Sequence, residues 1–184
     1  MKILIASDVH GSARFCSMLA ERIAEEDPDT VLLLGDLLYH GPRNALPEQY
    51  DPMAVADTLN GFKQHIIAVR GNCEAEVDQM VLDFPCMADY TELVDAQGRT
   101  LFATHGHLWN PESLPYIAPG GAFLYGHTHK KQLEETGGIL LVNPGSVSIP
   151  KDGSRSYAMF EDGVFSLKEL SGDLLAEAEL PSLR

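Results

Sequence analysis

The chain contains little cysteine and little positive charge. Its 184 residues include only three cysteines, Cys16, Cys73 and Cys86. Their odd number and wide separation argue against a disulfide framework and against a Cys-x-x-Cys zinc site. Lys and Arg number 13 against 27 Asp and Glu, which gives a formal net charge of −14. This charge disfavours stable binding to nucleic acids and anionic membranes, because both require a basic surface.

Long apolar runs and two common catalytic motifs are also missing. The first apolar stretch, residues 3–6, is too short for a signal peptide or a membrane span. A cleaved signal would also remove Asp8 and His10, which are candidate metal ligands. We therefore expect a cytoplasmic protein with no membrane partner. The sequence has neither a Gly-x-Ser-x-Gly elbow nor a P-loop, which argues against a serine hydrolase of that type and against a P-loop NTPase.

The residues that are present predict one α/β domain. Hydrophobic residues make up 45% of the chain and charged residues 22%, and 184 residues suffice for one full core, so we expect a single domain over 1–184. The predicted strands are 2–7, 30–34, 65–70, 90–95, 100–104, 122–126, 139–143, 156–161 and 164–170, and the predicted helices are 12–26 and 53–63. Alternation of strand and helix predicts parallel strands early in the chain, and Asp162-Gly163 predicts a hairpin late in it. Two packed sheets result.

Side chains that can bind metals follow five of these strands, where each strand ends. The candidates are Asp8, His10, Asp36, Asn72, His105, His107, His127 and His129. Ligand sites in α/β sheets usually lie at the carboxyl ends of strands. Each short motif alone is more often an ordinary turn than a metal site. The prediction of a metal site therefore depends on all of them occurring together, each at a strand end.

The ordered motifs resemble those of the calcineurin-like metallophosphoesterase superfamily. The family blocks are D-x-H, G-D, G-N-H-E/D, a histidine block and G-H-x-H. They correspond to Asp8-Val9-His10, Gly35-Asp36, Gly71-Asn72-Cys73-Glu74, Thr104-His105-Gly106-His107 and Gly126-His127-Thr128-His129. Within the superfamily the chain most resembles the small bacterial YfcE-type phosphodiesterases, in the segments 40–44, 69–73, 105–107 and 143–148. The resemblance covers residues 2 to about 170 and implies two central mixed β-sheets flanked by helices.

The resemblance also implies a phosphodiesterase that uses hydroxide activated by two divalent cations. It assigns one cation to Asp8, His10, Asp36 and His129, and the other to Asn72, His105, His127 and the bridging Asp36. Imidazole, carboxylate and amide oxygen suit Mn²⁺, which we expect first, with Mg²⁺, Ni²⁺, Fe²⁺ or Zn²⁺ as alternatives. The expected partner is a small phosphodiester whose identity the residues do not specify.

One position departs from the superfamily pattern. Cys73 stands where many members have histidine, although the YfcE-type group resembles this chain in having cysteine. A thiol with an ordinary pKa of about 8.5 could donate a proton but supplies no positive charge. Cys73 is therefore either a proton donor or simply a small, partly buried side chain. We expect His107 to assist the leaving group instead, and Arg43, in the Gly- and Pro-containing loop 35–52, to bind the substrate phosphate.

Two other functions fit part of the pattern. Some members of the superfamily, such as the retromer scaffold subunit, keep the fold and bind proteins without catalysis. Those members have typically lost ligand residues, whereas every expected ligand is present here. Dinuclear hydrolases of the metallo-β-lactamase type share a contiguous H-x-H-x-D-H block, which this chain lacks. The apolar strands near the C-terminus could serve an interface in a homo-oligomer.

Overall fold

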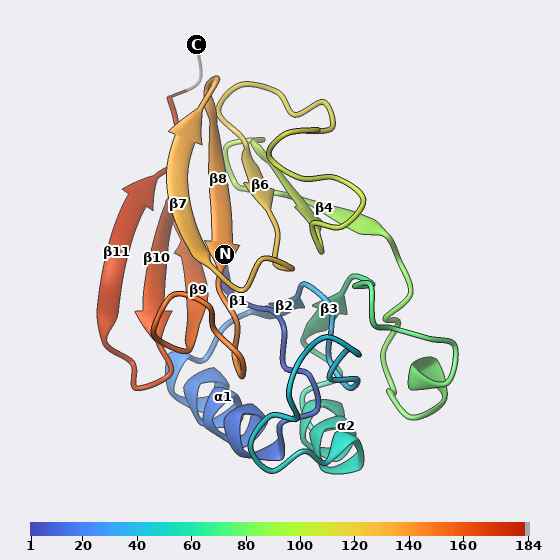
Figure 1. The fold of residues 1–184 in the computed structure, drawn as a ribbon. Helices are drawn as coiled ribbons and strands as arrows, with labels where there is room; N and C mark the ends of the chain where they lie inside the picture. Colours follow the sequence, from blue (N-terminus) through green and yellow to red (C-terminus); the bar gives the residue numbers. More distant parts are fainter. Residues whose placement is uncertain (183–184) are drawn as a thin grey trace.

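Two mixed β-sheets form the centre of the computed structural model, which describes residues 1–182 (Figure 1). The first sheet has the order β11-β10-β9-β1-β2-β3 and the second the order β4-β5-β6-β8-β7. The strands of the first sheet are β1 (Lys2–Ala6), β2 (Thr30–Leu33), β3 (Ile66–Ala68), β9 (Ser156–Glu161), β10 (Val164–Glu169) and β11 (Leu174–Glu179). Those of the second are β4 (Tyr90–Val94), β5 (Thr100–Thr104), β6 (Ala122–Leu124), β7 (Lys131–Thr136) and β8 (Ile139–Pro144). The helices are α1 (Ala13–Glu26), α2 (Pro52–Asn60) and a short 3-10 helix at Asp78–Met80.

The hydrophobic core has two main layers because the first sheet is buried on both faces. One face, with Leu4 and Leu33, packs against α1 and α2, which lie side by side on the same side of that sheet (Figure 1). The opposite face, with Ile5 and Leu32, packs against side chains of the second sheet such as Leu124. The outer face of the second sheet is covered by residues of the segment 105–121 in place of a helix. Strands buried on both faces explain the continuous apolar runs of β1 and β2.

The structure confirms the predicted two-sheet α/β fold, including the hairpins β4-β5 and β9-β10. Two strands, β7 and β11, were not predicted. Both lie at the edge of a sheet and have mixed, largely exposed sequences, KQLEET and LLAEAE, without clear apolar alternation. Helix α2 ends at Asn60, before Gly61, and not at residue 63. Across residues 1–182, no helix has the length and apolar character needed to span a membrane.

Strand direction brings the candidate ligands to one place. Strands β1, β2 and β3 are parallel, so their carboxyl ends lie on one edge of the first sheet. Strands β5, β6 and β8 are also parallel to one another. The amide of Gly126, after β6, donates to the carbonyl of His105, after β5, at 2.8 Å. The loops that follow the two parallel sets therefore lie together at the carboxyl ends of the strands.

Helix α1 is fixed at both ends by polar contacts. The Ser12 hydroxyl caps its first turn by accepting from the amide of Phe15. At the other end, the Glu26 carboxylate accepts hydrogen bonds from Tyr157 at 2.8 Å and from Lys168 at 2.7 Å. Partial burial raises the pKa of Glu26, but these two hydrogen bonds outweigh burial and hold the pKa below its ordinary value. Glu26 thereby ties α1 to β9 and β10.

Replacing this carboxylate should give a pH-dependent loss of stability. Because its folded-state pKa is depressed, Glu26 stabilises the fold above the unfolded value of about 4.3, and the contribution disappears as the pH falls through the folded value. Glu26→Gln should lower the free energy of unfolding at pH 7 by about 1–2 kcal/mol. The difference from wild type should shrink below about pH 4 in urea titrations. The control Glu21→Gln, an exposed change on the same helix, should leave the free energy of unfolding unchanged at both pH values. A loss of stability in Glu26→Gln that is the same at pH 7 and below about pH 4 would contradict the ion-pair explanation.

Candidate metal centre

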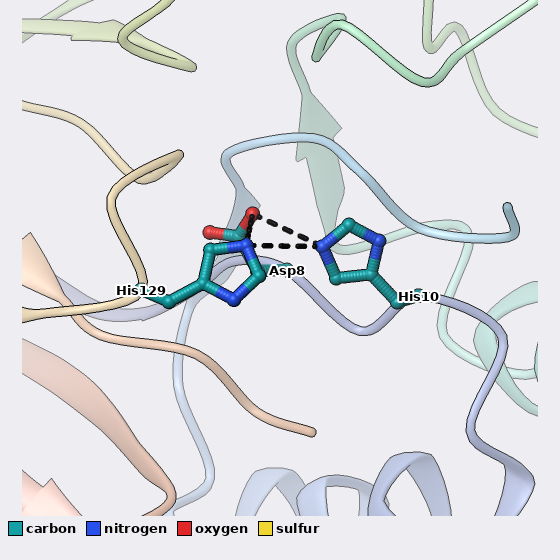
Figure 2. A group of neighbouring side chains, drawn as sticks. All are labelled: Asp8, His10 and His129. Atoms are coloured by element: carbon teal, nitrogen blue, oxygen red, sulfur yellow. Dashed lines mark hydrogen bonds and ion pairs between the residues drawn. The ribbon is translucent and has the colours of Figure 1, made fainter. Parts of the chain in front are cut away.

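Three buried side chains form the tightest group in the cluster (Figure 2). Asp8 and His10 follow β1, and His129 follows β6. The Nε2 atoms of His10 and His129 lie 3.2 Å apart. Each also lies close to Oδ1 of Asp8, at 3.5 Å for His10 and 3.3 Å for His129. Side chains separated by 119 residues along the chain therefore present donor atoms to a single point.

The outer nitrogens of three histidines show which ring atoms face this point. Nδ1 of His10 lies 2.9 Å from the carbonyl of Tyr39, Nδ1 of His129 lies 2.7 Å from that of Ile149, and Nδ1 of His105 lies 2.7 Å from that of Leu34. A carbonyl oxygen only accepts, so each Nδ1 carries a proton, and in the neutral ring each Nε2 presents its lone pair inward. This is the arrangement of metal-binding histidines, whose second nitrogen is fixed by a hydrogen bond.

This donor set fits a divalent cation. Two unprotonated Nε2 atoms facing each other at 3.2 Å repel unless a positive charge lies between them. In the described part of the chain, the buried Oδ1 of Asp8 has no hydrogen-bond partner, which is costly in the absence of a ligand. Burial lowers the pKa of His105, but Asp36 and Asp8 outweigh it and raise that pKa to about 9. The site therefore attracts positive charge, for which protons and metal ions compete.

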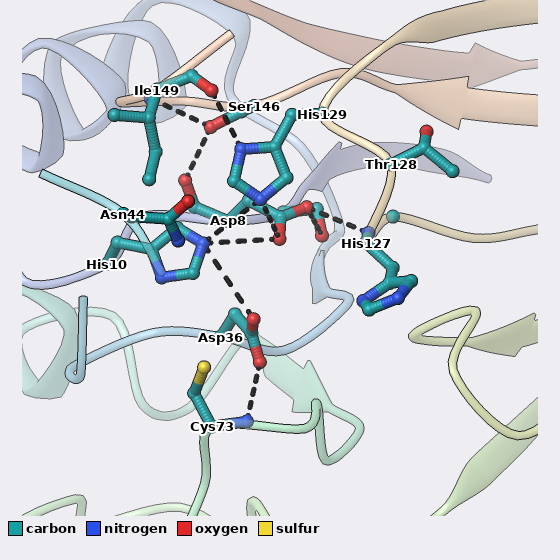
Figure 3. Close-up of polar contacts among 12 residues, drawn as sticks. Asp8, His10, Asp36, Asn44, Cys73, His127, Thr128, His129, Ser146 and Ile149 are labelled. Carbon is teal, nitrogen blue, oxygen red and sulfur yellow. Dashed lines mark hydrogen bonds and ion pairs between the residues drawn. The ribbon is translucent and has the colours of Figure 1, made fainter. Parts of the chain in front are cut away.

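Asp36 lies close to the first group and to a second one, and Figure 3 shows its contact with His10. Its Oδ2 is 3.7 Å from Nε2 of His10 and 3.4 Å from Nε2 of His105. The Asn72 Oδ1 atom is 3.2 Å from the same nitrogen of His105. The His127 ring centroid is 5.1 Å from that of His105. The structure thus brings together all seven predicted ligands, with Asp36 close to both His10 and His105.

Serine side chains hold Asp8 in place from two directions. The Ser7 hydroxyl donates to Oδ2 of Asp8 at 2.7 Å, and the amide of His127 donates to the same oxygen at 3.0 Å. The carbonyl of Asp8 accepts from the Ser146 hydroxyl at 2.8 Å and from the Ser148 hydroxyl at 3.1 Å. These contacts leave Oδ1 as the carboxylate atom directed at His10 and His129.

Glu74 holds the backbone around Asp36 in place. Its Oε2 accepts from the amides of Asp36 at 2.9 Å and Gly71 at 2.5 Å, and its Oε1 accepts from the amide of Leu37 at 2.7 Å. The loops after β2 and β3 are thereby joined. A β-carbon at Gly71 would lie 2.1 Å from Oδ1 of Asp36, so only glycine fits this close approach.

A cleft of about 440 Å³ opens onto the cluster. Two basic side chains line it, the predicted Arg43 and Lys151, and Cys73 and His127 also contribute to its wall. Both basic residues are exposed. Lys151 is placed by a hydrogen bond from its amide to the carbonyl of His129 at 2.9 Å. The rim of the cleft therefore carries positive charge, although the protein as a whole is acidic.

The two other predicted catalytic residues lie near the cluster in different ways. Cys73 is half-buried, and its amide donates to Oδ1 of Asp36 at 2.9 Å (Figure 3). Burial, followed by the charges of Asp36 and Glu74, raises the pKa of the Cys73 thiol, which keeps it protonated. His107 lies beside His105, with ring centroids 5.4 Å apart. Burial and the neighbouring histidines lower the pKa of His107, which favours the neutral imidazole.

Several residues that build the site were not predicted from the sequence. Ser146 and Ser148 belong to the segment 143–148, which carries the family resemblance, but no local pattern indicates that their hydroxyls support Asp8. Glu74 is the last residue of a recognised motif and could have been identified as a supporting residue from that position. Lys151 has no sequence signal, because it belongs to no motif and lies beyond the predicted ligands. Arg70, which directly precedes the Gly71-Asn72 motif, pairs with Asp89 at 2.6 Å.

Comparisons with known proteins agree with this geometry. Residues 1–162 match the calcineurin-like phosphoesterase superfamily domain. The chain is 47% identical over 172 residues to phosphodiesterase YfcE of Escherichia coli, covering 93% of each chain. It is 26% identical over 154 residues to phosphodiesterase MJ0936 of Methanocaldococcus jannaschii, covering 79% of this chain and 83% of the other.

Solved structures show the same relationship. The structure of YfcE, a phosphoesterase from Escherichia coli, matches with a TM-score of 0.95 at 44% identity, covering 98% of this chain and 100% of that one. Vps29 from Entamoeba histolytica, complexed with Zn²⁺, matches with a TM-score of 0.65 at 17% identity, covering 98% of this chain and 99% of that one. At such a low identity the match shows a shared fold alone. The family model and the identity to YfcE together show that the chain belongs to the calcineurin-like phosphoesterase superfamily.

Proposed function

We propose that this protein is a cytoplasmic, metal-dependent phosphodiesterase with a dinuclear centre in one domain, residues 1–184. The observation that carries the proposal is the arrangement of inward-facing Nε2 atoms around two buried carboxylates, Asp8 and Asp36. The identity of 47% to a protein named phosphodiesterase YfcE supports a phosphodiester as substrate. Convergence of the complete ligand set supports catalysis over a purely protein-binding scaffold.

We assign the seven ligands to two metal positions. Asp8, His10 and His129 would hold one cation, Asn72, His105 and His127 would hold the other, and Asp36 would contact both. Mn²⁺ is the cation expected first, with Mg²⁺, Ni²⁺, Fe²⁺ or Zn²⁺ as alternatives, because the set combines imidazole with carboxylate and amide oxygens. When bound, two such cations supply positive charge for a phosphate group and lower the pKa of a water molecule.

The remaining residues would bind and orient the substrate. Arg43 and Lys151 are placed to bind phosphate oxygens at the rim of the cleft, which offsets the repulsion expected from a chain of net charge −14. His107, as a neutral imidazole, would donate a hydrogen bond to the leaving oxygen. The protonated Cys73, which lines the cleft, would contact the substrate, and its raised pKa makes it a weak proton donor.

Metal content tests the dinuclear assignment. Wild-type protein equilibrated with Mn²⁺ should retain about two ions per chain by elemental analysis after gel filtration. Asn72→Ala and His129→Ala each remove a ligand of one position only, so each variant should retain about one ion. His65→Ala, which changes an exposed histidine outside the cluster, should retain the wild-type content. A wild-type chain that holds a single ion would refute the dinuclear centre.

Hydrolysis tests the proposed activity. Metal-stripped protein should be inactive, and added Mn²⁺ should restore hydrolysis of bis(4-nitrophenyl) phosphate because the cations supply the charge that phosphate requires. The kcat/KM for this diester should exceed that for the monoester 4-nitrophenyl phosphate. The assay compares Mn²⁺, Mg²⁺, Ni²⁺ and Zn²⁺ across pH. Folded protein that binds metal but hydrolyses neither ester under any condition would favour the scaffold function.

Leaving-group dependence tests His107. His107→Ala should lose about 10- to 100-fold in kcat on a diester with an alkyl leaving group and less on one with 4-nitrophenolate, because a poor leaving group needs the hydrogen bond more. His107→Gln keeps an N–H donor and should recover part of the loss. Equal losses on both diesters would indicate a structural role for His107.

A further inference from the structure

A second hollow, of different chemistry, adjoins the metal cleft. It has a volume of about 330 Å³ and lies between the loop after β2, the start of α2 and the segment after β3. Its wall includes Tyr39, Tyr50, Met53, Val77 and Val81, and it shares Cys73 with the metal cleft. The amide of Cys73 donates a hydrogen bond to Asp36, so the hollow begins directly beside this candidate metal ligand.

The surface of this hollow is apolar and uncovered. Within residues 1–182, Tyr39, Met53 and Val77 remain 42%, 54% and 59% exposed. One carboxylate, that of Asp78, belongs to the wall, but it is buried and accepts a hydrogen bond from the amide of Ala75 at 2.9 Å. The hollow therefore offers apolar contact and no free charge, whereas the metal cleft beside it is polar.

The wall is also held in place by the elements that hold the metal ligands. The Tyr50 ring lies against Gly11, where an added β-carbon would be 2.5 Å from Cε2 of the ring. The backbone of Tyr50 pairs with that of Ser12, the residue that caps α1. The carbonyl of Tyr39 accepts from Nδ1 of the ligand His10. A hollow fixed in this way can select a ligand shape without first becoming ordered.

We propose that this hollow binds a flat, apolar ester group of the substrate while the metal cleft binds its phosphate. The inference rests on the proposed phosphodiesterase function and narrows its substrate class to diesters with at least one aromatic or similarly flat apolar group. The two spaces meet at Cys73, so a single small molecule can occupy both. Apolar walls with a few polar groups at one end are the usual make-up of small-molecule sites.

Two phosphonates test the assignment by binding alone. Phenylphosphonate and methylphosphonate share the phosphoryl group and differ in their apolar group. Titration calorimetry on Mn²⁺-loaded protein should show about tenfold tighter binding of phenylphosphonate, because the hollow removes the ring from water. Val77→Asp and Met53→Ser should abolish the preference, and Met53→Ser should leave the Kd of methylphosphonate unchanged. Val94→Asp and Leu174→Ser, which alter similarly exposed residues away from the hollow, should retain the preference.

The outcomes separate this inference from the function on which it rests. Equal binding of the two phosphonates by wild-type protein overturns the inference and leaves the proposed phosphodiesterase intact. Failure of both to bind overturns the inference together with the proposed function. The molecular mass of Val77→Asp is compared with that of wild type by light scattering. A lower mass together with a retained preference for phenylphosphonate would show that this face joins two copies of the chain, and would also overturn the inference.

Discussion

Left-handed backbone conformations at the strand ends are the constraint on which the metal centre depends. Asp8, His10, Asp36, His127 and His129 have φ values of 58°, 50°, 55°, 64° and 58°. Each such residue costs on the order of 1–2 kcal/mol compared with a right-handed one. Hydrogen bonds between loops oppose this cost: the amide of Asp8 donates to the carbonyl of Gly35, and the amide of His10 donates to that of Asp36. Such strain persists only where the surrounding structure over-determines it, and it is typical of functional sites.

The two-sheet core supplies that surrounding structure. Strands β1 and β2 are buried on both faces, so their ends are fixed with little freedom to relax. The turn after each strand directs its polar side chains away from the apolar layer and toward the edge where the carboxyl ends of the parallel strands lie. Carbonyl groups of the neighbouring loops then orient the histidine rings. The donor atoms are consequently in place before a metal binds, which reduces the ordering that binding would otherwise require.

Polar and apolar recognition are separated on the surface around this centre. The cleft with Arg43 and Lys151 suits an anion, and the adjoining hollow with Tyr39 and Val77 suits a group without charge. Cys73 stands at their junction, where a small, protonated side chain separates the two environments. A histidine at the same position would be larger and could carry a positive charge, so cysteine here changes the electrostatics as well as the shape of the boundary.

The sequence by itself determined the ligand types, their order and their location at strand ends, because apolar runs such as 30–34 and the motifs that follow them are local patterns. It also determined the two-sheet fold, apart from edge strands β7 and β11, whose exposed sequences carry little periodic signal. Only the tertiary structure decided that Asp36 lies between two ligand groups and that Lys151 reaches the cleft. It also decided that Ser146 supports Asp8 across 138 residues of chain. These features arise from hydrogen bonds and packing between distant segments, and no local periodicity or spacing encodes which distant partners meet.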